Sequence, residues 1–354
     1  MNHLSQRLDA IQAKLATEDV DALIVSSPLN ARYLSGFTGE GHIVIGKSDT
    51  VICTDGRYKV EAAEAQGCDA VFHPKGHLAG AIDCVTGFGA GTVAFEAEHV
   101  NYAAYEEMAA KLPEIPLMPA KGWIEELRLI KDEDEIAAMR EAARRADLAL
   151  ERFIGDLQVG QTEKTLAWKL DTLLMELDSE PSFNTIMASG LSAAKPHAVP
   201  GSRVLTEGDM LKIDMGARVD GYCSDITRTY FIGEPNGKII EVYNLVKQAQ
   251  AAAVAAVRPG VTGRELDTIA RDLITAGGYG EYFGHGLGHG VGLAVHEGPR
   301  VSSRSEDVLK PGMVVTIEPG IYLEDWGGVR IEDMVVVTET GCEVLTLAPK
   351  AEVQ

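Results

Sequence analysis

The sequence is poor in positive charge, in cysteine and in long apolar runs, and each shortage excludes a class of protein. Lysine and arginine total 32 against 53 aspartates and glutamates, so the net charge at pH 7 is −21. A chain with this charge repels nucleic acid and anionic membrane surfaces. We therefore expect no nucleic-acid partner and no membrane partner.

The five cysteines are scattered, odd in number and never spaced as Cys-x-x-Cys. This pattern indicates neither a disulfide framework nor a thiolate zinc site. The apolar runs are too short to cross a bilayer. The first 25 residues carry charges throughout an amphipathic pattern and lack the features of a cleaved signal. We expect a cytoplasmic protein with reduced thiols.

Short β-type runs alternate with helical patterns between residue 20 and about residue 120, which is typical of a small α/β domain. A proline-rich stretch ends this alternation. A long amphipathic pattern follows, in which Asp132 is placed to cap a helix with Glu135 reaching back. The sequence therefore predicts an α/β protein of two domains, residues 1–123 and residues 124–354.

Two stretches of the second domain, beginning at Gly160 and Gly260, match each other at a constant offset of 100 residues. Each predicts an amphipathic helix with a threonine cap, Thr162 in one and Thr262 in the other. Such a repeat arises either from two related halves that build one site between them or from a shared capping pattern alone.

A hairpin in the second domain brings two carboxylates together. Asp220-Gly221 is a strong signal for a two-residue turn between strands. The register that this turn sets places Asp214 opposite Thr227 and on the same face as Asp225. Two aspartates so close are either solvated on an exposed face or neutralised by a cation.

Two glutamates and a glycine-rich segment favour the cation. Glu318 ends one β-branched run and Glu332 lies inside another, where an unpaired charge in a buried strand is costly. Residues 284–297 place three histidines among closely spaced glycines, which permit close approach of the chain to a ligand. The candidate set is Asp214, Asp225, Glu318, Glu332 and His289 or a neighbouring histidine. Its formal charge of about −4 balances two divalent ions, and its donors suit Mn²⁺ first, with Co²⁺, Fe²⁺ or Zn²⁺ as alternatives.

Four blocks of this domain resemble a known metallopeptidase family in order and spacing: "IDMGARVDGYCSDITRTY", "GHGLGHGVGLAVHEGP", "VVTIEPGIY" and "GGVRIEDMVVVT". The family contains Xaa-Pro dipeptidase (prolidase), aminopeptidase P and methionine aminopeptidase. "NARYLSGFTGEG" and "TDGRY" extend the resemblance to the N-terminal domain of prolidases and aminopeptidase P. The resemblance implies a creatinase/prolidase-like α/β domain followed by a pseudo-symmetric pita-bread catalytic domain.

The resemblance also implies how the metal ligands divide. Asp214 would bind one metal ion, and His289 and Glu318 would bind the other. Asp225 and Glu332 would bridge the two ions. Such a pair of ions lowers the pKa of water and polarises a scissile carbonyl.

Further residues carry implied catalytic roles. Glu318 would pass a proton to the leaving nitrogen, while His197 and His296 would donate hydrogen bonds to the substrate and the oxyanion. His285 matches a third histidine that faces the substrate. Arg330, close to Glu332 in the sequence, either orients that carboxylate or binds a substrate carboxylate.

The activity implied by the resemblance is hydrolysis of Xaa-Pro bonds by a homodimer, in dipeptides or short peptides. Proline nitrogen has no hydrogen, so a site can select its bond by shape. We place a dipeptidase first and aminopeptidase P, which acts on longer peptides, second. A metal-free creatinase-like enzyme and a non-catalytic peptide-binding protein share the fold, and the intact ligand set disfavours both.

Overall fold

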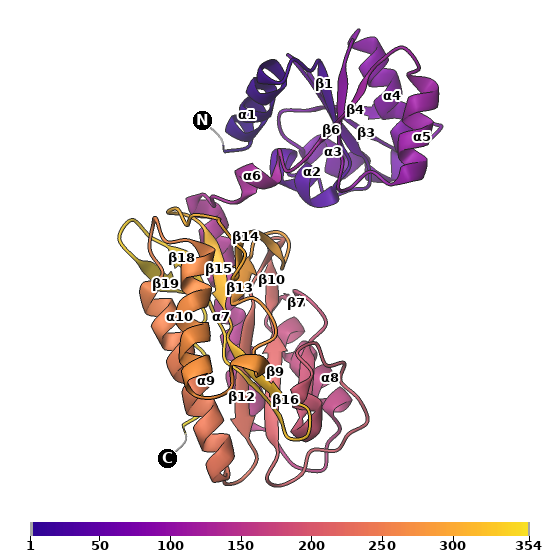
Figure 1. Ribbon diagram of the computed structural model, residues 1–354. Helices are drawn as coiled ribbons and strands as arrows, with labels where there is room; N and C mark the ends of the chain where they lie inside the picture. The colour runs from indigo at the N-terminus through magenta and orange to yellow at the C-terminus, as the bar shows by residue number, and fades with distance from the viewer. Residues whose placement is uncertain (1–2, 353–354) are drawn as a thin grey trace. The chain divides into compact units, whose positions relative to one another are not determined.

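The computed structural model describes residues 3–352 and separates into two compact units, Met1–Arg128 and Leu129–Gln354. Each unit has its own elements and its own apolar core (Figure 1). Within residues 3–352, no helix is both long and apolar enough to cross a membrane.

The N-terminal unit is built around a six-stranded sheet of order β4-β3-β2-β1-β5-β6. All neighbours pair in parallel except β2, which runs antiparallel between β1 and β3. The strands are β1 (Ala22–Val25), β2 (His42–Gly46), β3 (Thr50–Thr54), β4 (Asp69–Phe72), β5 (Val93–Glu96) and β6 (Leu117–Ala120). The helices are α1 (His3–Thr17), α2 (Pro28–Ser35), α3 (Lys59–Glu64), α4 (His77–Gly87), α5 (Tyr102–Lys111) and α6 (Glu125–Arg128), with a 3₁₀ turn at Gly56–Tyr58. The alternating pattern of the sequence therefore forms the predicted α/β unit.

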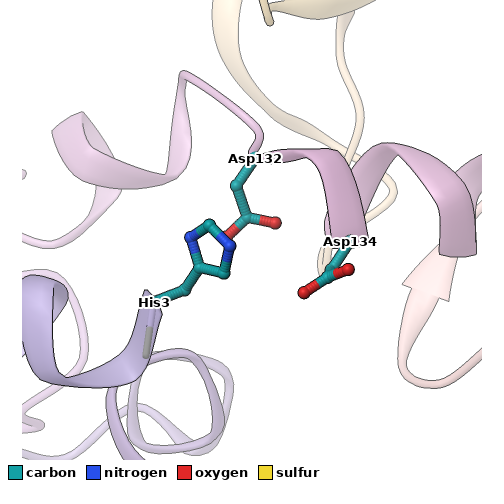
Figure 2. Close-up of side chains that lie close together, drawn as sticks. All are labelled: His3, Asp132 and Asp134. Atoms are coloured by element: carbon teal, nitrogen blue, oxygen red, sulfur yellow. The ribbon is translucent and has the colours of Figure 1, made fainter. Parts of the chain in front are cut away.

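The second unit has two pairs of helices. The first pair is α7 (Glu133–Gly155) with α8 (Glu163–Glu176), and the second is α9 (Gly237–Ala256) with α10 (Gly263–Ala276). Asp132 caps α7, and Asp134 lies in the first turn of that helix (Figure 2). The predicted reciprocal bond is present, because Glu135 Oε2 accepts from the Asp132 backbone nitrogen at 2.9 Å.

Both predicted threonine caps are also present. Thr162 Oγ1 accepts a hydrogen bond from the Thr165 nitrogen at the start of α8, and Thr262 Oγ1 accepts one from Glu265 at the start of α10. Each of these threonines also forms an isolated β-bridge, Thr162 with Val204 and Thr262 with Val308. The repeat in the sequence therefore corresponds to a repeat in the structure.

The strands of the second unit form small sheets, chiefly β12-β9-β8 and β14-β13-β15-β18-β19, with β11-β10-β7 and β16-β17 beside them. Their bounds are β7 (Glu180–Pro181), β8 (Ile186–Ser189), β9 (Met210–Met215), β10 (Ala217–Val219), β11 (Tyr222–Cys223), β12 (Ile226–Phe231), β13 (Gly288–Gly290), β14 (Glu297–Val301), β15 (Val314–Ile317), β16 (Gly320–Leu323), β17 (Gly327–Arg330), β18 (Asp333–Val337) and β19 (Cys342–Val344). Short 3₁₀ turns occupy Gly190–Ala194 and Gly280–Tyr282.

One helix pair packs on the sheet β12-β9-β8, and the other packs on the five-stranded sheet. Buried residues of α7 and α8, including Phe153 and Leu170, form one core with Ile213 of β9. Buried residues of α9 and α10 form another with Val315 of β15 and Val335 of β18. In Figure 1, α9 and α10 run side by side along this second sheet. The helices cover one face of each sheet, and the other face is available for the residues of the site.

Candidate metal centre

The hairpin that carries Asp214 and Asp225 has the predicted register. Asp220 and Gly221 both have positive φ, 48° and 82°, as the tight turn of a twisted hairpin requires. Val219 pairs with Tyr222, and Thr227 pairs with Asp214. Asp214 therefore lies near the end of β9, and Asp225 lies directly before β12.

Glu318 and Glu332 have equivalent positions on a second hairpin. Ile317, the last residue of β15, pairs with Asp333, the first residue of β18, so the two glutamates lie at the same end of this pair. Glu332 is only 2% exposed. Its Oε2 atom accepts a hydrogen bond from Thr227 Oγ1 at 2.7 Å, and its backbone nitrogen donates to the Thr227 carbonyl at 3.0 Å. The two hairpins therefore meet where their carboxylates are.

Glycine allows His289 to reach this group. A Cβ at Gly288 would lie 2.0 Å from the Thr316 carbonyl oxygen, so only glycine permits β13 to approach β15 this closely. The His289 backbone nitrogen donates to Thr316 Oγ1 at 3.1 Å. His289 Nε2 lies 3.6 Å from Asp225 Oδ2 and 3.4 Å from Glu318 Oε1. The glycine-rich segment thus supplies one imidazole to four carboxylates.

The His289 ring presents a lone pair to these carboxylates. Its Nδ1 atom lies 3.0 Å from the Gly290 carbonyl oxygen, which can only accept, so Nδ1 carries the proton. Burial lowers the pKa of His289 to about 4, so the ring is neutral at pH 7. Nε2 is therefore an acceptor, and it faces carboxylate oxygens that are also acceptors when ionised. A cation between them resolves this arrangement, because neutral imidazole and carboxylate are both metal ligands.

The electrostatics of the carboxylates lead to the same conclusion. Burial, followed by neighbouring carboxylates, raises the pKa of Asp225 and of Glu332 well above the usual range. Burial also raises the pKa of Glu318 to about 7. Asp214 Oδ1 is buried and accepts no hydrogen bond from any residue in the range 3–352. The residues present therefore fit divalent cations, which would neutralise the group and occupy the unused oxygen.

The candidate residues surround two cavities. A cavity of about 110 Å³ is lined by all five candidate ligands and by His197, His296 and Arg330. A larger cavity of about 680 Å³ shares His289, Glu318 and the last three residues, and adds His285, Lys195 and Arg300. All nine residues singled out from the sequence therefore lie around one of these two spaces.

Arg330 is buried and makes several contacts on one side of the site. Its Nε atom donates to Thr227 Oγ1 at 2.9 Å, its Nη1 atom donates to Pro196 O at 3.1 Å and to Tyr322 Oη at 2.9 Å, and its Nη2 atom donates to Asp214. These bonds use four of the five N–H groups of a guanidinium. Arg330 therefore orients the Asp214 carboxylate, and not that of Glu332 as the sequence suggested, and has one N–H group left.

His285 is also held by its neighbours. Its Nδ1 atom donates to the Gly286 carbonyl at 2.7 Å, so its Nε2 atom accepts from the Tyr322 hydroxyl at 3.0 Å. Burial lowers the pKa of His285 to about 4. The His296 ring, in contrast, is exposed, and its centroid lies 4.4 Å from that of His289.

Sequence reasoning missed Thr227, Tyr322 and Arg300. Thr227 had a usable signal, because the predicted register placed it directly opposite Asp214. Tyr322 follows Glu318 within "EPGIY", but only the folded structure shows that it lies between Arg330 and His285. Arg300 had no signal, since it reaches the site from β14.

Both units of the chain match known protein families. Residues 137–339 match metallopeptidase family M24, and residues 7–130 match the creatinase/prolidase N-terminal domain. The chain belongs to the metallopeptidase family M24. The predicted family and the predicted pita-bread fold class are therefore confirmed, and the cofactors of such an enzyme are divalent metal ions.

Individual M24 relatives are similar over almost the whole chain. The Xaa-Pro dipeptidase of Pyrococcus horikoshii is 37% identical over 98% of this chain and 98% of its own. The structure of an Xaa-Pro dipeptidase from Bacillus anthracis is 38% identical, with a TM-score of 0.95 over 99% of both chains. An X-Pro aminopeptidase from Thermotoga maritima is 36% identical, with a TM-score of 0.88 over 94% of this chain and 97% of its own.

Proposed function

We propose that this M24 enzyme hydrolyses the Xaa-Pro bond of dipeptides with two divalent metal ions, Mn²⁺ first among them. The observation that carries the proposal is the convergence of five ligand-type side chains beside a substrate-sized cavity. Relatives that bear the name Xaa-Pro dipeptidase support the choice of bond. Asp214 would bind one ion, His289 and Glu318 the other, and Asp225 and Glu332 both. When bound, such ions lower the pKa of water and polarise a carbonyl.

The side chains of this enzyme then have distinct tasks. Glu318 lines both cavities and lies 3.4 Å from His289 Nε2, so its carboxylate is placed to accept a proton and to pass it to the proline nitrogen. His197 and His296 line both cavities and can donate hydrogen bonds to the substrate carbonyl as negative charge develops on its oxygen. His285 and Arg330 line the larger cavity and shape the space for the substrate.

The larger cavity also favours a substrate with a free carboxylate close to the scissile bond. Arg300 and Lys195 line it, and neither side chain makes an ion pair with any residue of the described range 3–352. Arg330, in contrast, is already bonded to Asp214. Two unpaired cations beside the metal ligands suit the carboxylate of a dipeptide better than the neutral amide of a longer peptide.

A comparison of three substrates tests this proposal. With Mn²⁺ present, kcat/KM for Ala-Pro is expected to exceed that for Ala-Pro amide and for Ala-Pro-Ala. Arg300→Met is expected to reduce this preference, whereas Arg304→Met, at an exposed arginine of the same segment, should leave it unchanged. A higher kcat/KM for the amide or the tripeptide would instead favour aminopeptidase P, the second candidate, whose name an M24 neighbour bears.

Two coarser features of the enzyme belong to the same proposal. We infer functional domains of residues 1–123 and 124–354, and the split into compact units after Arg128 supports a boundary in this region. We also infer a cytoplasmic homodimer, as the family resemblance implies. Light scattering on the purified enzyme would measure its mass directly.

A further inference from the structure

Lys212 is a fully buried lysine beside the site, and the proposed reaction does not use it. It lies on β9, two residues before Asp214, and has no exposed surface. Its Nζ atom lies over the Tyr322 ring, 4.9 Å from the centroid. A buried ammonium requires hydrogen-bond acceptors, and the structure shows which backbone provides them.

Three carbonyl oxygens of one turn accept from this ammonium. They belong to Ala193 at 3.0 Å, Lys195 at 2.6 Å and Pro196 at 3.4 Å. The Pro196 carbonyl also accepts from Arg330 Nη1. The turn immediately before His197 is therefore held by two buried basic side chains, Lys212 on β9 and Arg330 on β17.

His197 depends on this turn for its position. Its side chain is exposed, lines both cavities and makes no hydrogen bond within the part of the chain that the structure describes. A Cβ at Gly328 would lie 2.3 Å from the Ala193 carbonyl oxygen, so β17 also supports the turn through close backbone contact. The backbone, and not a bond to the ring, therefore sets where the imidazole lies.

The second hairpin has an equivalent arrangement. Thr316 lies two residues before Glu318, as Lys212 lies two residues before Asp214. Its hydroxyl accepts from the backbone nitrogen of His289, the imidazole ligand. On both hairpins, the residue two before a carboxylate ligand anchors a segment that carries a histidine of the site.

We propose that Lys212 is a positioning residue that fixes the Ala193–Pro196 turn and thereby places His197 against the substrate. This inference rests on the proposed function for its effect on the reaction, but the anchoring of the turn does not. Loss of the ammonium would remove a donor from the Ala193 and Lys195 carbonyl groups, leave Arg330 alone on the Pro196 carbonyl, and free the turn to move. A shift of about 1 Å in a group that contacts the reacting carbonyl costs up to about 10²-fold in rate.

A double-mutant cycle on the Mn²⁺-loaded enzyme tests the effect on the reaction. Lys212→Met is expected to lower kcat/KM for Ala-Pro about tenfold or more, with unchanged metal content. In the His197→Ala background, the same change is expected to have less than about a twofold effect, because the group it positions is absent. Equal fold losses in both backgrounds would overturn the proposal and leave Lys212 a general structural residue.

Hydrogen–deuterium exchange on the metal-free protein without substrate tests the anchoring separately. Lys212→Met is expected to speed exchange in peptides that cover residues 190–197, and Lys238→Met, at an exposed lysine over the Trp326 ring, should not. Unchanged exchange in that turn would overturn the proposal whatever the activity. If the wild type fails to hydrolyse Ala-Pro, the proposed function fails, and the exchange experiment still decides the role of Lys212. If Lys212→Met does not fold, Lys212→Gln, which keeps two N–H donors on a shorter side chain, replaces it in both experiments.

Discussion

The two halves of the catalytic unit share a backbone plan and differ in the side chains they bring to the site. In the first half, from α7 to β12, Asp214 lies near the end of β9 and Asp225 directly precedes β12. In the second, from α9 to β18, Glu318 directly follows β15 and Glu332 directly precedes β18.

The two halves differ in the other side chains that surround these carboxylates. The second half adds an imidazole, His289, on a strand that glycine allows to approach closely. The first half has no histidine among the candidate ligands and adds Lys212 and Thr227. The repeated backbone therefore accounts for two pairs of carboxylates, and the additions unique to each half account for the chemistry between them.

Removing one carboxylate from each half should have the largest effect. Asp225→Asn and Glu332→Gln change the two equivalent positions that we propose to bridge the ions, and a neutral amide would bridge two cations poorly. Since even outer partners of metal ligands matter 10- to 100-fold, each variant should lose more than about 100-fold in activity together with bound metal. Elemental analysis and kcat/KM would be measured on both. Retention of both ions by either variant would contradict the equivalence of the two positions.

Replacement of His296, which is not a candidate metal ligand, should have a smaller effect. His296→Ala should keep both metal ions and lose about 10²-fold in kcat, because it removes a donor to the substrate and not a ligand. The same elemental analysis separates this outcome from that of Asp225→Asn. Equal metal loss in the two variants would contradict the role of His296 as a substrate donor and would make it a metal ligand.

The smallest effect concerns the caps that the halves share. Thr162→Ala and Thr262→Ala should each lower the free energy of unfolding by about 1 kcal/mol, since each removes an acceptor for a helix N-terminal N–H group. Thr262→Ala should cost more, because it also removes the hydrogen bond from the Thr262 hydroxyl to the Glu265 carboxylate at 2.9 Å. Thr172→Ala and Thr268→Ala, at exposed positions inside the same helices, serve as controls. Equal changes in the free energy of unfolding at the caps and at the controls, measured by denaturant titration, would contradict a capping role for Thr162 and Thr262.

The sequence predicted the parts of the site that local rules determine. The Asp220-Gly221 turn set a register that brought Asp214 and Asp225 to one face, and the β-branched runs around Glu318 and Glu332 predicted buried carboxylates. The capped helices were predictable for the same reason, because a cap is decided within four residues.

The rest of the site depends on contacts between segments distant in sequence. Lys212 meets the Ala193–Pro196 turn only because that turn packs under β17, and no periodicity in either segment encodes this. Tyr322 and Arg300 are ordinary strand residues until the fold places them beside His285 and the larger cavity. Side-chain protonation could not be predicted either, since the tautomer of His285 depends on its contacts with the Gly286 carbonyl and the Tyr322 hydroxyl.

We propose that the carboxylates of the two halves and His289 act together by holding two divalent ions for hydrolysis of Xaa-Pro dipeptides. The most direct test removes all metal with a chelator, verifies its absence by elemental analysis, and titrates Mn²⁺ back while Ala-Pro hydrolysis is followed. We expect the metal-free protein to be inactive and its activity to rise, as Mn²⁺ is added, to a plateau at about two ions per chain. Full turnover by the metal-free protein, or a plateau at one ion per chain, would contradict it.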